Sequence, residues 1–373
     1  MMSVYPVLKQ YDDREIDQAI ASVSRDDVDR ALTADYPNVN NFLAFLSPAA
    51  EVRLEQMAIS AHDLTLRHFG RTLQLYTPLY LSDYCENRCT YCSFSARNPF
   101  PRRKLGPDEV DREGAAIAET GLRHILILTG ESRKQSPVEY ISDCVTLLKK
   151  YFHSIAIEIY PLTQTEYAAL IDRGVDGLTL YQETYNEALY QAIHPAGPKR
   201  DYRFRLDAPE RAAAAHMRQI NIGALLGLAD WRKEVFALGL HARYLMDRFP
   251  DADIGVSAPR LRPFKGSFSQ TCSVTDSHLV QALLSLRLFL PRIGISLSTR
   301  ESETFRDHLI PLGITRLSAG SVTSVGGHAA LAAEETALPQ FEIADHRTVE
   351  QMTEMIRSRG YDPVLSDWVP YDL

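Results

Sequence analysis

Short apolar segments recur along most of the chain and alternate with longer segments in which the apolar residues have helical spacing. Short continuous apolar runs indicate buried strands, because the strands of a parallel sheet are covered on both faces. The chain contains eight such runs, at residues 73–81, 124–128, 155–159, 177–181, 220–225, 254–257, 294–297 and 315–317. Eight strands separated by helices predict an α/β protein built as a (β/α)8 barrel of the TIM type.

The segments between the predicted strands carry the periodicity of amphipathic helices. Val138, Ile141, Val145 and Leu148 fall on one helical face, and the same spacing recurs in residues 235–249 and 279–290. Helices are also predicted before the barrel, the longest at 48–68 and another that Ser24 could cap, and one is predicted after it, at 348–359. We therefore divide the chain into an N-terminal helical extension (1–70), the barrel (71–325) and a short helical tail packing on the barrel (326–373).

Composition and charge limit the functions that fit this chain. With 373 residues, of which 45% are hydrophobic, it can bury a large core, and a net charge of −8 argues against nucleic acid as a main partner. No apolar run approaches the length of a membrane span, and the first residues lack a signal-peptide pattern. We expect a cytoplasmic protein without a membrane partner, in a compartment where cysteines stay reduced.

The most distinctive local feature is a group of three cysteines directly after the first predicted strand. Cys85, Cys89 and Cys92 have the spacing C-x3-C-x2-C, so three thiolates on one loop can face one centre. Soft thiolate ligands select zinc, copper or iron–sulfur clusters. A structural zinc site usually has four closed ligands, and the other two cysteines, Cys144 and Cys272, stand alone. We interpret the loop as the holder of a four-iron cluster that keeps one iron open, with Cys144 as a core residue.

Polar residues follow several predicted strands at their C-terminal ends, where active sites of such barrels lie. Glu158 interrupts an apolar strand, and an unpaired charge inside a barrel is costly, so we expect its carboxylate to accept hydrogen bonds from a ligand. Arg300 has a planar fork suited to a carboxylate, which Ser318 on the next strand could share. Tyr80, just before the cysteine loop, either faces into the barrel or packs outward.

The pattern C-x3-C-x-aromatic-C, with Tyr91 as the aromatic residue, resembles the signature of the radical S-adenosylmethionine enzymes. In that superfamily the open iron of a [4Fe-4S] cluster is chelated by S-adenosylmethionine, so the resemblance implies both cofactors and an adenine contact for Tyr91. Three residues after the second strand are similar to the family's Gly-Gly-Glu motif, which implies that they bind the amino group of S-adenosylmethionine: Thr129, Gly130 and Glu131. Glu158 could hold ribose hydroxyls or an ammonium group, and Arg205 could pair with the methionine carboxylate or lie in solvent.

Further segments resemble the aromatic amino acid lyase branch of this superfamily, and most closely the 2-iminoacetate synthase family of thiamine thiazole biosynthesis. They are residues 80–82, 128–131, 181–185, 223–228, 259–263, 297–301, 318–321 and 367–368. The resemblance implies cleavage of the Cα–Cβ bond of L-tyrosine to 2-iminoacetate and p-cresol, with 5′-deoxyadenosine and methionine as co-products. It implies Arg300, Tyr80 and Ser318 as substrate-binding residues, thiazole synthase as a partner, and a reductant of the flavodoxin or ferredoxin type.

Two alternatives stay open at this stage. The substrate could be another aromatic amino acid such as tryptophan, which a related lyase holds through residues matching Tyr80, Arg300 and Ser318. The chain could also be a non-catalytic iron–sulfur protein. The related tyrosine lyase of hydrogenase cofactor assembly carries a second cysteine-bound cluster in a C-terminal extension, and since no cysteine follows Cys272 we do not expect that activity. The oligomeric state and the roles of Cys272 and the N-terminal helices are not predicted.

Overall fold

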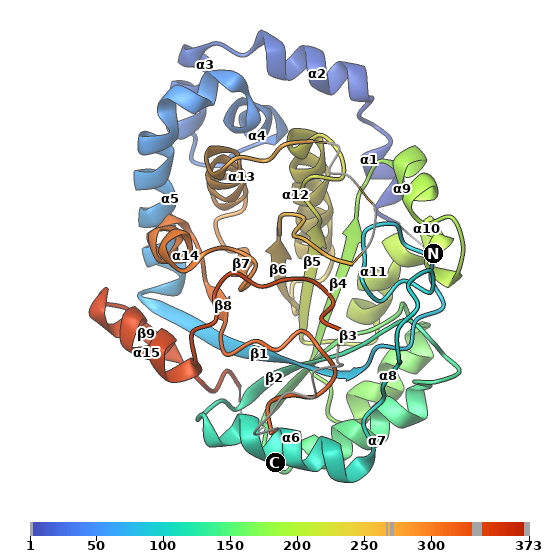
Figure 1. The fold of residues 1–373 in the computed structure, drawn as a ribbon. Helices are drawn as coiled ribbons and strands as arrows, with labels where there is room; N and C mark the ends of the chain where they lie inside the picture. Colours follow the sequence, from blue (N-terminus) through green and yellow to red (C-terminus); the bar gives the residue numbers. More distant parts are fainter. Residues whose placement is uncertain (1–2, 266–267, 269–271, 330–337, 369–373) are drawn as a thin grey trace.

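A closed barrel of eight parallel strands forms the centre of the protein (Figure 1). The computed structural model describes residues 3–265, 268, 272–329 and 338–368. The barrel strands are β1 (Thr72–Ser82), β2 (His124–Thr129), β3 (Ser154–Glu158), β4 (Gly177–Glu183), β5 (Gln219–Ala224), β6 (Asp253–Ser257), β7 (Gly294–Leu297) and β8 (Arg316–Ser318). β1 pairs in parallel with both β2 and β8, which closes the barrel. All eight predicted strands and the predicted fold class are confirmed.

Helices alternate with the strands and cover the outside of the barrel (Figure 1). They are α6 (Pro107–Glu119), α7 (Val138–Leu148), α8 (Gln164–Arg173), α9 (Glu187–Ile193), η2 (Pro198–Arg200), α10 (Tyr202–Leu206), α11 (Ala208–Ala214), α12 (Trp231–Arg248), α13 (Asp276–Phe289), α14 (Glu303–Leu309) and η3 (Ile310–Leu312). The predicted faces of α7, α12 and α13 are buried in the core, and Cys144 on α7 is buried there as predicted.

The N-terminal extension is helical, as predicted, and packs on α12 and α13 (blue in Figure 1). Its elements are α1 (Tyr5–Leu8), α2 (Asp13–Ser22), α3 (Arg25–Leu32), α4 (Val39–Leu46), η1 (Pro48–Arg53) and α5 (Leu54–Phe69), and Ser24 caps α3. The ring of Phe42 on α4 stacks on Phe289 with centroids 4.2 Å apart. Gly239 on α12 makes this contact possible, because a Cβ atom there would lie 2.4 Å from the Phe42 ring.

The tail contains a strand that the sequence analysis did not predict. After α15 (Val349–Ser358), β9 (Asp362–Val364) pairs in parallel with the first three residues of β1. β2 pairs with β1 only from Thr77 onward, so β9 joins the sheet beside the part of β1 that β2 leaves free. Residues 362–364 are Asp-Pro-Val, with a proline and no continuous apolar run, and for that reason the tail was expected to be helical only.

The interior of the barrel is hollow and is lined by both polar and apolar side chains. Barrels of this type are usually filled with bulky branched side chains. Here a cavity of about 180 Å³ extends from the cysteine loop at the C-terminal ends of the strands to residues that begin strands at the other end, namely His124, Gln219 and Arg316. Gly255 leaves room for Arg316, because a Cβ atom would lie 2.9 Å from its guanidinium. The fold therefore provides a chamber along the barrel axis that contains charged and polar groups among apolar ones.

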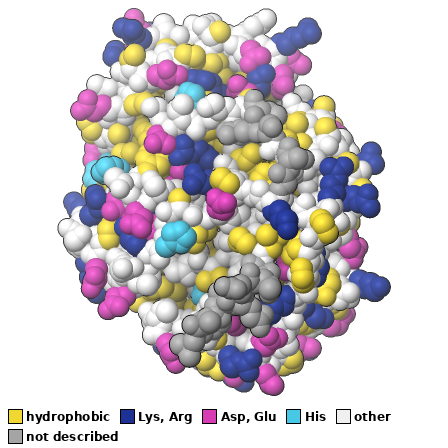
Figure 2. Space-filling model, in the orientation of Figure 1, with side chains coloured by type: hydrophobic (Ala, Val, Ile, Leu, Met, Phe, Trp, Pro, Cys, Tyr) yellow, Lys and Arg dark blue, Asp and Glu magenta, His cyan; other side chains and the backbone are white. Residues whose placement is uncertain are grey.

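On the face drawn in Figure 2, acidic and basic side chains are interspersed. The longest described helix, α12, has 18 residues and carries several charged side chains. Within the described ranges, no helix is long and apolar enough to cross a membrane.

Candidate active site

The three cysteines lie together at one end of the cavity, on the loop that follows β1. The loop has no regular secondary structure, and its shape is fixed by bonds to neighbouring loops. Its backbone N–H groups donate to carbonyl groups of neighbouring loops and of the end of α9: Glu86 to Glu131 at 3.0 Å, Arg88 to Ala196 at 3.0 Å and Thr90 to Ile193 at 3.1 Å. The cysteines are therefore held at the cavity wall by contacts that the fold itself supplies.

The three thiols fit the predicted [4Fe-4S] cluster. Each is free, and burial raises the pKa of Cys85 to about 11 and also raises the pKa of Cys89 and Cys92. Such thiols lose their protons when iron binds, because metal ligation requires the thiolate. Within the described part of the chain, no three His, Cys, Asp or Glu side chains are arranged to hold a single metal ion. A cluster is wider, and it takes one thiolate on each of three irons.

A buried network of charges lies beside the cysteine loop. The guanidinium of Arg205 lies 2.7 Å from the carboxylate of Glu131, which also accepts a hydrogen bond from Asn87 at 2.7 Å. Lys199 pairs with Glu183 at 2.7 Å, and all four charged side chains are at most 12% exposed. Burial alone would raise the pKa of Glu131, but the charges of Arg205 and Lys199 hold it below its usual value. The sequence allowed Arg205 either to pair with a carboxylate or to lie in solvent, and the prediction that it lies in solvent is wrong.

Tyr91 is fixed by a buried histidine. Its hydroxyl lies 2.7 Å from Nε2 of His194, and Nδ1 of the same ring lies 2.8 Å from the carbonyl oxygen of Tyr190. A carbonyl can only accept, so Nδ1 carries a proton. Burial lowers the pKa of His194 to about 2, which makes the ring neutral and leaves Nε2 to accept the proton of the Tyr91 hydroxyl. This pair orients the aromatic ring of the cysteine motif at the cavity wall.

The three residues Thr129, Gly130 and Glu131 line the cavity directly against the cysteine loop. A Cβ atom on Gly130 would lie 2.4 Å from the carbonyl oxygen of Tyr84, so only glycine allows this approach. The Gly130 N–H donates to the carbonyl of Ser82 at 2.7 Å. The hydroxyl of Thr129 is buried and has no hydrogen-bond partner among the described residues. Such a group is suited to a ligand that enters the cavity.

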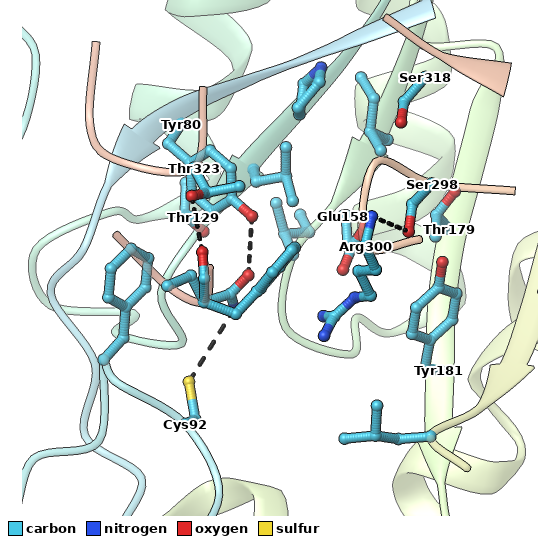
Figure 3. Close-up of a pocket in the computed structure, with 18 of the residues that line it drawn as sticks. Tyr80, Cys92, Thr129, Glu158, Thr179, Tyr181, Ser298, Arg300, Ser318 and Thr323 are labelled. Atoms are coloured by element: carbon cyan, nitrogen blue, oxygen red, sulfur yellow. Dashed lines mark hydrogen bonds between the residues drawn. The ribbon is translucent and has the colours of Figure 1, made fainter. Parts of the chain in front are cut away.

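Among the charged side chains of the cavity, Glu158 and Arg300 have no opposite partner within ion-pair distance in the described part of the chain. The guanidinium of Arg300 stacks on the ring of Phe341, 3.4 Å from its centroid. Burial lowers the pKa of Arg300 below its usual value. Burial, followed by the charge of Glu183, raises the pKa of Glu158 to about 7. Figure 3 shows Glu158 and Arg300 near each other on the side of the chamber away from Cys92. Both fit the sequence expectation of groups that wait for a ligand.

Tyr80 and Ser318 also face the cavity. The inward orientation of Tyr80 decides between the two that the sequence allowed, and its hydroxyl donates to Gln340 at 2.7 Å. The Ser318 hydroxyl accepts the backbone N–H of Thr299 at 3.0 Å and also forms a side-chain hydrogen bond with Tyr76. The structure thus places every predicted site residue on one cavity.

Among the cavity residues that the sequence analysis did not select are Asn87, Lys199, Gln340 and Phe341. Asn87 lies inside the cysteine motif, so its position alone could have indicated it. Gln340 and Phe341 lie in a segment without helical or strand periodicity, and no local pattern marks them.

A (β/α)8 barrel whose mouth carries three cysteines with this spacing defines the class of radical S-adenosylmethionine enzymes. Residues 79–238 match the Radical SAM superfamily, and residues 257–362 match the Biotin and Thiamin Synthesis associated domain. The chain is 40% identical to the 2-iminoacetate synthase of Escherichia coli (strain K12), covering 97% of this chain and 96% of that protein. It is also 40% identical to the 2-iminoacetate synthase of Salmonella typhimurium, covering 92% and 90%. The chain belongs to the 2-iminoacetate synthase family, and its cofactors are a [4Fe-4S] cluster and S-adenosylmethionine.

Solved structures agree with this assignment. The crystal structure of HydG, a maturase of the [FeFe]-hydrogenase, superposes with a TM-score of 0.87 at 30% identity, covering 95% of this chain and 80% of that one. HydG from Carboxydothermus hydrogenoformans gives a TM-score of 0.84 at 30% identity, covering 97% and 82%. Methylornithine synthase, at 19% identity and a TM-score of 0.72, shares the fold.

Proposed function

We propose that this protein cleaves the Cα–Cβ bond of L-tyrosine to 2-iminoacetate and p-cresol, with 5′-deoxyadenosine and methionine as co-products. The observation that carries the proposal is the unpaired guanidinium of Arg300 inside a cavity that also holds the three cysteines, in a chain 40% identical to 2-iminoacetate synthase over nearly its whole length. The 2-iminoacetate produced would supply thiamine thiazole biosynthesis.

The cysteine side of the cavity is proposed to hold the cofactors. Cys85, Cys89 and Cys92 would bind the cluster, which together with S-adenosylmethionine supplies a 5′-deoxyadenosyl radical for hydrogen abstraction. The ring of Tyr91 would contact the adenine, and the backbone of Thr129, Gly130 and Glu131 would bind the methionine amino group. Arg205, whose Nε donates to the carbonyl of Tyr181 and whose Nη1 donates to Glu131, would bind the methionine carboxylate through its remaining N–H groups.

Arg300 is proposed to bind the tyrosine carboxylate. A guanidinium in a buried site gains most from a planar anion that takes two parallel hydrogen bonds. The Ser318 hydroxyl would turn from Tyr76 to donate to the same carboxylate, and Tyr80 would provide an aromatic wall. Glu158, with a pKa of about 7, would accept hydrogen bonds from the substrate ammonium or from ribose hydroxyls. These contacts would hold the amino acid by its polar end and leave its side chain inside the chamber.

The product suggests the partners. An imine hydrolyses readily in water, so we propose direct delivery of 2-iminoacetate to thiazole synthase. We further propose a reductant of the flavodoxin or ferredoxin type and a location in the cytoplasm, where the five cysteines stay reduced.

The proposal is tested by anaerobic reconstitution with iron and sulfide, followed by reduction in the presence of S-adenosylmethionine and tyrosine. We expect 5′-deoxyadenosine, p-cresol and glyoxylate, the hydrolysis product of the imine, in equal amounts by chromatography. Deoxyadenosine without p-cresol would overturn tyrosine as the substrate, and tryptophan would be tried next. No deoxyadenosine from a fully loaded cluster would favour a non-catalytic iron–sulfur protein.

A further inference from the structure

Residues 338–347 lead from the barrel mouth to α15, and two of them line the cavity. The side-chain amide of Gln340 lies between a cysteine and a tyrosine. Its Nε2 is 4.0 Å from Sγ of Cys92, and its Oε1 accepts the hydroxyl of Tyr80 at 2.7 Å. Figure 3 shows the dashed line that ends on Cys92. The next residue, Phe341, carries the guanidinium of Arg300 on its ring, 3.4 Å from the centroid.

The backbone of this segment is fixed on both sides of the dipeptide. The Gln340 N–H donates to the carbonyl of Thr323 at 2.9 Å, and the Thr323 hydroxyl donates to the carbonyl of Phe341 at 3.0 Å. Further on, Ala344 donates to the carbonyl of Thr299 at 2.8 Å. Asp345, fully buried, forms an ion pair with Arg306, which is 1% exposed. The position of the Gln340 amide is therefore set by the fold rather than by side-chain freedom alone.

Chemistry fixes the direction of the amide. A cysteine sulfur bound to iron is a thiolate, which accepts hydrogen bonds and repels a carbonyl oxygen. The nitrogen of Gln340 must then face Cys92, and the oxygen must face Tyr80. Tyr80 consequently donates its proton to Gln340 and offers its own oxygen lone pairs to the cavity. One amide links a cluster ligand with a residue of the substrate site.

We infer that Gln340 is a positioning residue. Its amide donates a hydrogen bond to Sγ of Cys92, the cysteine sulfur that binds the cluster, and orients the hydroxyl of Tyr80 for the bound amino acid. Hydrogen bonds to the sulfur atoms of a cluster stabilise its reduced, more negative state and raise its reduction potential. The first half of the inference needs only the cluster. The second half rests on the proposed function, because it assigns Tyr80 to the substrate.

The first experiment is a redox titration of the reconstituted cluster in the absence of tyrosine, in which electron paramagnetic resonance monitors the reduced cluster. We compare the wild type with Gln340→Leu, Gln340→Glu and the control Gln351→Glu. The control makes the same change on the same tail, and glutamate preserves the capping box at the start of α15. We expect a more negative midpoint potential for Gln340→Leu, a still more negative one for Gln340→Glu, and no change for the control.

Equal midpoint potentials in the wild type and in both Gln340 variants, at equal iron and sulfide content, would overturn the inference. Gln340→Glu is nearly isosteric with the native residue, so it keeps the test decisive if the leucine variant loads its cluster poorly. Since tyrosine is absent, this result is independent of whether the protein cleaves tyrosine.

The second experiment is a double-mutant cycle on tyrosine binding with Tyr80→Phe and Gln340→Leu. Each single change removes the same hydrogen bond, so each should weaken tyrosine binding by roughly three- to tenfold, and the double variant should be no weaker than the stronger of the two singles. Fully additive losses would show that Gln340 does not act through Tyr80.

Discussion

Two groups of charges in the same cavity have opposite surroundings. We call Glu131, Glu183, Lys199 and Arg205 the paired group, because each has an opposite charge within hydrogen-bonding distance. We call Glu158 and Arg300 the unpaired group, because neither has such a partner in the described part of the chain. A buried charge is costly unless it is paired. The paired group is therefore complete in the protein alone, whereas the unpaired group is completed by what binds.

Two carboxyls show the contrast directly. The pKa of Glu131 lies below its usual value because Arg205 and Lys199 outweigh the effect of burial, whereas burial raises the pKa of Glu158 to about 7. At neutral pH Glu131 is ionised and Glu158 is near half protonation. The same residue type thus serves structure at one place and ligand binding at another, and the surrounding charges decide which.

The largest effect on activity should come from the loss of a cluster ligand, which lies outside both groups of charges. Cys89→Ala should prevent cluster formation and abolish 5′-deoxyadenosine production, because three thiolates are the minimum set of ligands. The matched control is Cys144→Ala, which removes a buried core thiol on α7 outside the cavity. Iron content and the yield of deoxyadenosine are measured for both variants. A cluster of normal stoichiometry in the Cys89 variant would contradict the assignment.

Breaking the paired group should destabilise the fold. Arg205→Met leaves Glu131 buried without its cation, and such a change costs about 3 to 5 kcal/mol. The measurement is denaturant unfolding of the cluster-free protein. The second change Glu131→Gln, added to Arg205→Met, should recover part of the loss. Loss of the exposed pair of Lys150 with Asp111 should leave the unfolding midpoint unchanged. An unfolding midpoint of Arg205→Met equal to wild type would remove the distinction between the two groups.

Removing a member of the unpaired group should have the opposite pattern. Arg300→Met should leave the unfolding midpoint unchanged or slightly higher, because the change breaks no ion pair within the protein. Tyrosine binding should weaken about 10- to 100-fold, the range expected for lost hydrogen bonds to a charged group. Calorimetric titration of the cluster-loaded variant with tyrosine provides the measurement. Retained tyrosine affinity would contradict the role of Arg300 as the carboxylate site.

The smallest effect is a pH dependence that should differ in sign between the two carboxyls. A pKa raised to about 7 on folding means that Glu158 takes up protons in the native state, so stability falls as pH rises from about 5 to 8. Glu158→Gln should remove about 2 kcal/mol of this fall in the cluster-free protein. For Glu131 the pKa is lowered, so its contribution is present at neutral pH and is lost as pH falls.

Unfolding at pH 5 and pH 8 tests Glu158, whereas the contribution of Glu131 is tested by unfolding at pH values below its ordinary pKa of 4.5. Glu234 also has its pKa raised to about 7 by burial, but it is present in both the wild type and Glu158→Gln, so its contribution cancels in the difference. Identical pH profiles for Glu158→Gln and the wild type would contradict the assignment of a carboxyl without a counter-charge in the cavity.

The sequence alone was sufficient for the barrel, the cysteine motif and the family. Every barrel strand was predicted, because a strand that is buried on both faces has a continuous run of apolar residues in its sequence. The three cysteines were readable because all the ligands lie on one short loop. The same local reading missed β9, whose three residues carry no pattern, and it could not show that the barrel is hollow, since this depends on which residues face inward around all eight strands.

Only the tertiary structure decided which charges are paired. Arg205 and Glu131 are 74 positions apart, and Tyr80 and Gln340 are 260 apart. At Glu183 the backbone takes a positive φ of 72° beside an irregularity in the β4–β5 pairing, which aims its carboxylate at Lys199. Local patterns determine local structure because neighbouring residues share one helix or strand. Contacts between distant residues exist only once the barrel has closed, and in this protein they separate the residues that complete the fold from those left to bind a ligand.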